Sequence, residues 1–440
     1  MKTTRKALIL SVLSLAAAMG TASQGNAQVT NASASTLALA GNHTASVRGF
    51  GAISVNPAGL AMPGSGFSLA LLSGGGRAGF APVTLWDFAE FQGALVPTST
   101  KEAWLSKIIA SGEEQGSVGA QVTLLALTAG NLGFQLSATG SVDATIPPGV
   151  AEGVLYGNAG RTGSVTDLSL TGATLKGFVV STAALSYALP LTDALALGVT
   201  GKYIRGHGVA VARSVAGAIE SGPIRGTLDF QAATTCTDDT DRRCEQDFAN
   251  GGSGYGLDLG VMLNLGRITL GGSMQNLVNT FEWDTRTLSY RRGVIDTMEE
   301  EEEEEEEEVS SANNFDEQLF ANAPADMKTS IRDYAFQPSY RLGATLDVTS
   351  ALTLTGDIHG ELGDDGISLG QRSHAGVGAE LRAGFVHFRG GVAKITDGMQ
   401  YGGGASLVLG PVNLSGAVGL QRGEERETVM GQFVLSFGNR

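Results

Sequence analysis

Strict alternation of apolar and polar residues is the feature that most limits how this chain can fold. In residues 411–421, Leu414 and Val418 alternate with Asn413 and Ser415. A period of two puts successive side chains on opposite faces of a strand. Each such stretch is therefore predicted to be a β-strand with one apolar and one polar face. The same pattern recurs in residues 352–362, 371–383 and 428–437.

The connections between the predicted strands are short at one end and long at the other. An even number of antiparallel strands with this asymmetry is typical of an outer-membrane β-barrel. We therefore predict an all-β fold, a transmembrane antiparallel β-barrel of about fourteen strands with short helices in its external loops. The predicted strands cover about 67–73, 117–127, 131–143, 174–189, 194–212, 253–265, 267–290, 333–348, 351–362, 370–383, 385–395, 399–409, 411–421 and 426–437. The long external loops cover about 74–116, 144–173, 213–252 and 291–332, with a helix expected at 101–112.

The amino-acid composition agrees with a β-rich chain and limits which classes of partner it could bind. The 63 glycines among 440 residues disfavour a helical protein, because an interior glycine costs a helix up to ~1 kcal/mol. A secreted soluble β-sandwich would alternate too, but its core would need more large residues than this Gly- and Ala-rich apolar face supplies. The net charge is −15, mostly from ten consecutive glutamates at 299–308, a run with no assigned role. No nucleic-acid partner is expected from this balance.

The N-terminus predicts export to a Gram-negative-type outer membrane. A basic start, an apolar stretch at 7–18 and small residues at 25–27 define a signal peptide at 1–27. Because an exported chain meets an oxidising compartment, Cys236 and Cys244 are predicted to form a disulfide. The aspartates between them lack the EF-hand spacing, so neither a metal site nor a cofactor is predicted.

Short motifs in the first two thirds of the chain resemble a known superfamily. The box Asn56-Pro57-Ala58 follows a small-residue stretch just before the first predicted strand. Further motifs are Gly130-Asn131-Leu132-Gly133-Phe134, Ile146-Pro147-Pro148 and Leu155-Tyr156-Gly157-Asn158. Together they resemble FadL/PorV-like outer-membrane barrels, in a branch known only as a domain of unknown function.

The resemblance implies a domain organisation and two functions. Residues 28–66 would form a plug, with Asn56, Pro57 and Ala58 as its motif, inside a barrel of residues 67–437. The first function is a FadL-like outer-membrane channel for hydrophobic or amphipathic small molecules, with outer-membrane lipids around it. The alternative is a PorV-like structural or secretion-accessory barrel that binds other proteins at its external loops.

Strand parity places charged residues on the polar face, which in a barrel is the lumen. They either solvate the lumen and hold a plug, or form a polar gate or a head-group site. An enzyme is not predicted, because no G-x-S-x-G elbow accompanies Asp357 and His359. Glycines within strands, among the Gly-rich stretches at 74–76 and 402–404, suggest bends or the close approach of another backbone, such as a plug. The lumen candidates are Arg341, Asp357, His359, Glu361, Arg372, His374, Glu380, Arg382 and Arg389, with Lys202, Asp347 and His387 on the same face.

Overall fold

The computed structural model describes most of the chain after the predicted signal peptide. The described residues are 33–157, 161–162, 167–221, 224–235, 251–296, 314–362, 373–396, 398–423 and 426–438. Several sequence predictions lie outside them: the signal peptide at 1–27, the Cys236–Cys244 disulfide, the glutamate run at 299–308 and the lumen candidate Arg372.

Fourteen strands form one closed antiparallel ring, as predicted. Each strand pairs with the next one around the ring, and β1 closes it by pairing with β19, from Ser68 opposite Gly438 to Phe80 opposite Glu427. The ring consists of β1 (Ser68–Ala81), β2 (Glu114–Ala129), β3 (Leu132–Ile146), β5 (Thr174–Pro190), β6 (Leu195–Ser221), β8 (Gly252–Asn264), β9 (Ile268–Asn279), β13 (Ser339–Asp347), β14 (Leu352–Glu361), β15 (Ser373–Ala383), β16 (Val386–Ile395), β17 (Gly398–Leu409), β18 (Val412–Gly423) and β19 (Glu427–Gly438).

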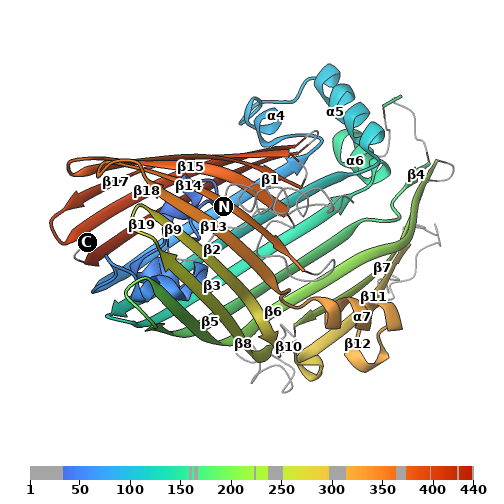
Figure 1. The fold of residues 1–440 in the computed structure, drawn as a ribbon. Helices are drawn as coiled ribbons and strands as arrows, with labels where there is room; N and C mark the ends of the chain where they lie inside the picture. The colour runs from blue at the N-terminus through green and yellow to red at the C-terminus, as the bar shows by residue number, and fades with distance from the viewer. Residues whose placement is uncertain are drawn as a thin grey trace, which may run out of the picture.

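The two ends of the ring differ as the sequence predicted. Tight turns join β2 to β3, β8 to β9 and β17 to β18, with glycines at positive φ in Gly130, Gly266 and Gly410. We call this the short-turn end; β19 also finishes there. The helices that follow residue 66 and the additional strands gather at the opposite, long-loop end, as Figure 1 shows.

The strand boundaries correct the loop predictions in three places. The expected loop 74–116 begins inside β1, which continues to Ala81 because its three glycines still pair with β2 and β19. Much of the expected loop 213–252 is a hairpin between the end of β6 and β7 (Ile224–Thr235). The expected strand 267–290 is interrupted after Asn279 and continues as β10 (Glu282–Trp283) and β11 (Leu288–Asp296), and β11 pairs with β12 (Asn314–Leu319).

Helices occupy the long-loop end. The predicted helix at 101–112 is found as α5 (Thr98–Ser111), which ends at Gly112 with φ 89°. It packs through Trp104, Leu105 and Ile108 in a cluster with α6 (Pro148–Tyr156), beside α4 (Leu85–Ala89). A fourth helix, α7 (Ala325–Asp333), lies on the other side of the long-loop end. Within the described residues, no helix has the length and apolarity needed to span a membrane.

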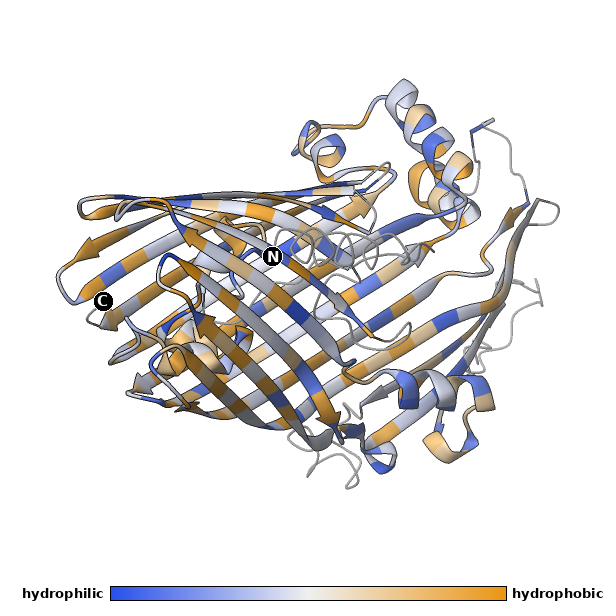
Figure 2. Cartoon of the chain, in the orientation of Figure 1, coloured by the Kyte–Doolittle hydropathy of each residue, from blue (hydrophilic) through white to orange (hydrophobic). Residues whose placement is uncertain are grey.

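The two faces of the wall follow the sequence alternation. Leu414 is 39% and Val418 67% exposed, whereas Asn413 and Gln421 on the same strand are buried. Figure 2 shows the resulting bands of apolar and polar residues along the strands. The large apolar residues therefore face outward and the polar residues inward, which is the arrangement of a barrel wall in lipid and the reverse of a sandwich.

Residues 33–66, which we call the N-terminal segment, lie within the ring. They contain α2 (Ala34–Ala38), α3 (Ala52–Val55) and the 3-10 turns η1 (Gly49–Gly51) and η2 (Pro57–Ala61). The α2 helix contacts β16 to β19, whereas η2 contacts β5, β6 and β8 on another part of the wall. In Figure 1 the segment fills the half of the barrel nearest the short-turn end.

Candidate functional site

Inward-facing glycines let the N-terminal segment lie directly against the wall. A Cβ on Gly198 would stand 2.2 Å from the Ala58 nitrogen, and one on Gly391 2.3 Å from the Leu39 oxygen. A Cβ on Gly402 would lie 2.2 Å from the Leu37 oxygen. The predicted close approach of another backbone is thus found at Gly402, but not at Gly74, where nothing lies within 4 Å.

The Asn56-Pro57-Ala58 box is fully buried where the N-terminal segment meets β6 and β8. The Asn56 amide nitrogen donates to the carbonyls of Thr44, at 3.3 Å, and Val261, at 3.2 Å. Its Oδ1 accepts from the Ala58 N–H at 3.2 Å, which caps η2. Pro57 occupies the first turn, where its fixed φ and missing donor are tolerated. The box therefore ties two parts of the segment to each other and to β8.

A row of ionisable side chains holds the middle of the segment. Arg341, His359 and His374 stand opposite one another across β13, β14 and β15, and the two imidazole rings stack at 3.8 Å. His374 Nε2 lies 3.2 Å from Asn42 Oδ1. Asp357 Oδ2 accepts from the backbone N–H groups of His43, at 2.9 Å, and Thr44, at 2.8 Å. Two members of this row, Asp357 and His374, therefore form hydrogen bonds to the segment.

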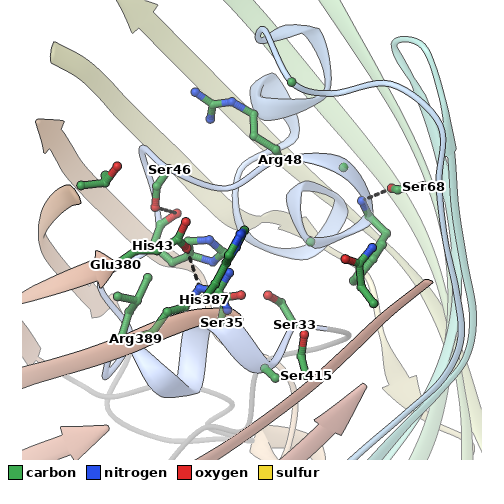
Figure 3. A pocket seen from close by; sticks show the side chains of 18 of the residues that line it. Ser33, Ser35, His43, Ser46, Arg48, Ser68, Glu380, His387, Arg389 and Ser415 are labelled. Carbon is green, nitrogen blue, oxygen red and sulfur yellow. Dashed lines mark hydrogen bonds and ion pairs between the residues drawn. The ribbon is translucent and has the colours of Figure 1, made fainter. Parts of the chain in front are cut away.

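A polar cavity of about 500 Å³ lies between the segment and the wall at the short-turn end. Glu380 accepts from Arg389 at 2.6 Å and from Arg382 at 2.7 Å, so one carboxylate holds two guanidinium groups. Figure 3 shows His43, Glu380, His387 and Arg389 gathered on one side of this cavity and Ser68 on the other. The cavity can hold water or a polar group.

The remaining lumen candidates lie near the rims. Glu361 is half-buried at the end of β14 nearest the long loops, and Arg382 is exposed at the short-turn end. Asp347 is also exposed and accepts from Thr353 Oγ1 at 2.7 Å. The structure thus brings Arg341, Asp357, His359 and His374 into one layer and Glu380, Arg382 and Arg389 into another.

Aromatic side chains fill the lumen at the long-loop end, and the sequence analysis did not identify them. We call Phe178, Phe281, Trp283, Tyr334 and Phe336 the aromatic cluster; all are buried. The Phe281 ring lies 5.0 Å from Trp283 and 5.4 Å from Phe336. Trp283 lies in the two-residue strand β10, and Tyr334 lies between α7 and β13. The alternation of apolar and polar residues along long strands therefore could not place either side chain.

The wall is irregular beside this cluster. Leu257 of β8 pairs with Val278 of β9, but Leu259 already pairs with Met274. Three residues of β9, 275–277, therefore stand opposite a single residue of β8, Asp258. We call this irregularity the wall break. On the outer face beside it lies an apolar hollow of about 490 Å³, lined by Leu185, Tyr203, Tyr255 and Val278 among others.

The closed ring, its outward apolar face and its filled interior define a FadL-type outer-membrane β-barrel fold. The chain itself belongs to the family of unknown function DUF5723, whose model matches residues 72–418.

Solved structures agree with this fold. The Pseudomonas putida toluene transporter TodX is 12% identical, with a TM-score of 0.53 over 92% of this chain and 98% of TodX. A Pseudomonas aeruginosa FadL homologue is also 12% identical, with a TM-score of 0.51 over 94% of this chain and 99% of that one. A TodX deletion mutant, described as a monoaromatic hydrocarbon channel, gives 13% identity and a TM-score of 0.53 over 93% and 99%. No curated protein matches the chain.

Proposed function

We propose that this protein is an outer-membrane channel for hydrophobic or amphipathic small molecules. The observation that carries the proposal is the apolar aromatic cluster inside the long-loop end of a FadL-type barrel. Buried aromatic rings in the lumen offer an apolar solute a surface that would stabilise it there. The similar structures include a toluene transporter.

A solute path follows from the arrangement of these parts. An apolar molecule would enter among the external helices, where Trp86, Leu95 and Val154 are exposed, and then reach the aromatic cluster. The N-terminal segment, acting as a plug, would block the direct route to the short-turn end. The solute would leave either through the wall break into the outer apolar hollow, or past the plug through the polar cavity, which would suit an amphipathic head group.

Two measurements test this function. The protein purified from outer membranes should carry lipid-like or aromatic small molecules, which mass spectrometry of extracts would detect. Cells whose outer membrane contains the protein should take up the apolar fluorophore 1-N-phenylnaphthylamine faster than cells without it, because a lipopolysaccharide leaflet otherwise slows its entry. Truncation of Trp283 to alanine should slow that uptake, and uptake no faster than in cells without the protein would reject the channel.

A second function is favoured by the filled lumen. The N-terminal segment lies toward the short-turn end of the barrel, and the aromatic cluster lies at the long-loop end. A structural or secretion-accessory barrel that transports nothing would have its lumen filled in the same way. In that case the external helices would bind a protein partner. Removal of residues 28–59 distinguishes the two functions, because only a channel should gain single-channel conductance in planar bilayers when its plug is deleted.

A further inference from the structure

Side chains replace backbone pairing at the wall break. The pairing of β9 with β13 stops where Gln275 stands opposite Ser339, the first residue of β13. Residues 276–279 of β9 therefore have no β13 residue opposite them. On the other side, residues 275–277 stand opposite Asp258 alone. Backbone polar groups in a membrane-embedded wall must find partners, so this place depends on the side chains that supply them.

Asn276 is where these substitute bonds meet. Its backbone has φ 51°, in the left-handed region that asparagine adopts more readily than other non-glycine residues. The Asn276 N–H donates to Asp258 Oδ1 at 2.7 Å, and Asn276 Oδ1 accepts from Lys202 Nζ at 2.5 Å. Lys202 also forms an ion pair with Asp258 at 2.7 Å, and the Asp258 side chain is only 4% exposed. These three side chains hold the wall break together.

The third bond of Asn276 reaches the aromatic cluster. Its Nδ2 donates to the Gln337 carbonyl at 3.2 Å. Residues 334–337 are further held by Asn279 Nδ2, which donates to the Phe336 carbonyl at 2.7 Å, and by Trp283 Nε1, which donates to the Tyr334 carbonyl at 2.7 Å. The Phe336 side chain, 5% exposed, packs between the rings of Phe178 and Phe281.

We propose that Asn276 is a positioning residue that couples the aromatic cluster to the wall break. Phe336 occupies the space that an apolar solute would take, and the hydrogen bond to the Gln337 carbonyl holds Asn276 in its left-handed conformation. A solute that displaces Phe336 moves Gln337, breaks the bond to Asn276 and loosens residues 275–277. This inference rests on the proposed channel function, and it adds a link from the lumen to one place in the wall.

The position of the outer hollow agrees with this coupling. Val278 and Leu257, which flank the wall break, line the apolar hollow together with Tyr203 and Tyr255, whose rings lie 5.5 Å apart. A solute released at the break would therefore meet apolar surface and would not meet the polar lumen. When Phe336 moves, the bonds from Asn276 to the Gln337 carbonyl and from Asn279 to the Phe336 carbonyl change, whereas the bonds to Lys202 and Asp258 remain within the wall.

Hydrogen–deuterium exchange of the full protein in detergent micelles tests the link without any transport assay. Phe336→Ala should accelerate amide exchange of residues 275–279 at least about tenfold, as expected for a local opening. Phe320→Ala is the matched control, because Phe320 is 4% exposed in the same core but lies outside residues 334–337. Its effect on residues 275–279 should stay below about twofold. If Phe336→Ala does not fold, Phe336→Leu serves in its place.

The double variant shows whether Asn276 carries the link. In an Asn276→Ala background, exchange at residues 275–279 is already fast, and adding Phe336→Ala should change it little. Equal acceleration by Phe336→Ala and Phe320→Ala, or full acceleration in the Asn276→Ala background, would overturn the proposal. Uptake of 1-N-phenylnaphthylamine is measured separately on the same variants. Coupled exchange without uptake would reject the channel and keep the link, whereas uptake without coupled exchange would reject the link alone.

Discussion

Gly198→Ala should displace the Asn56-Pro57-Ala58 box from the barrel wall. The new Cβ would lie 2.2 Å from the Ala58 nitrogen and 2.3 Å from the Pro57 carbonyl carbon. Ordinary contacts between such atoms are about 3.5 Å, so the box must retreat by about 1 Å. Both obstructing atoms belong to the backbone, and no side-chain rotation relieves the overlap.

The magnitude follows from the contacts that such a retreat disrupts. Overpacking of a buried site costs about 1–3 kcal/mol. The hydrogen bond that joins the box to the wall, from Asn56 Nδ2 to the Val261 carbonyl, already measures 3.2 Å, so a shift of this size breaks it, at about 0.5–1.5 kcal/mol. A total loss of about 1.5–4.5 kcal/mol would weaken docking of the segment at least about tenfold.

Limited proteolysis of residues 33–66 and single-channel conductance in planar bilayers would measure this loss. Both should rise in Gly198→Ala, while the heat-modifiable mobility of the folded barrel on gels stays unchanged. Gly201→Ala is the matched control: it lies on the same strand, and nothing stands within 4 Å of its Cβ position. Equal proteolysis and conductance in the two variants would refute the account of how the segment is seated.

Three further predictions concern the wall, the segment and the cysteines. Leu414→Arg should impair membrane assembly by about 2–4 kcal/mol if the position lies near the bilayer midplane, and Asn413→Arg should not; equal damage by both in a heat-modifiability assay would count against a lipid-facing wall. Burial, followed by the charge of Arg389, lowers the pKa of His43 to about 3, so the docked segment holds a neutral imidazole between pH 3 and the ordinary pKa of 6.5. Because a released segment binds that proton, acidification from pH 7 to 5 should speed its proteolysis, and His43→Gln should reduce this pH dependence. Thiol alkylation with intact-mass measurement should find Cys236 and Cys244 oxidised in exported protein, and two free thiols would exclude the bridge.

The sequence determined the wall of this protein. Lipid on one side and the filled lumen on the other impose a period of two, so the faces of Leu414 and Asn413 and the positions of the short turns followed from residue order alone. The same parity predicted Arg341, Asp357, His359 and His374 on the inner face, and these four side chains are buried in the structure. The box at residues 56–58 was recognised by resemblance alone, and in the structure it lies directly against Gly198.

Only the tertiary structure decided what fills the lumen and where the wall is interrupted. Trp283, in the two-residue strand β10, comes together with Tyr334 and Phe336, which lie more than 50 residues further along the chain between α7 and β13, so no local period marks them. The position of Asn276 likewise depends on hydrogen bonds with Lys202, Asp258 and Gln337, which come from three other parts of the chain. Such contacts arise because closing the ring brings distant residues into one interior, and pairing across that interior leaves no trace in the order of neighbouring residues.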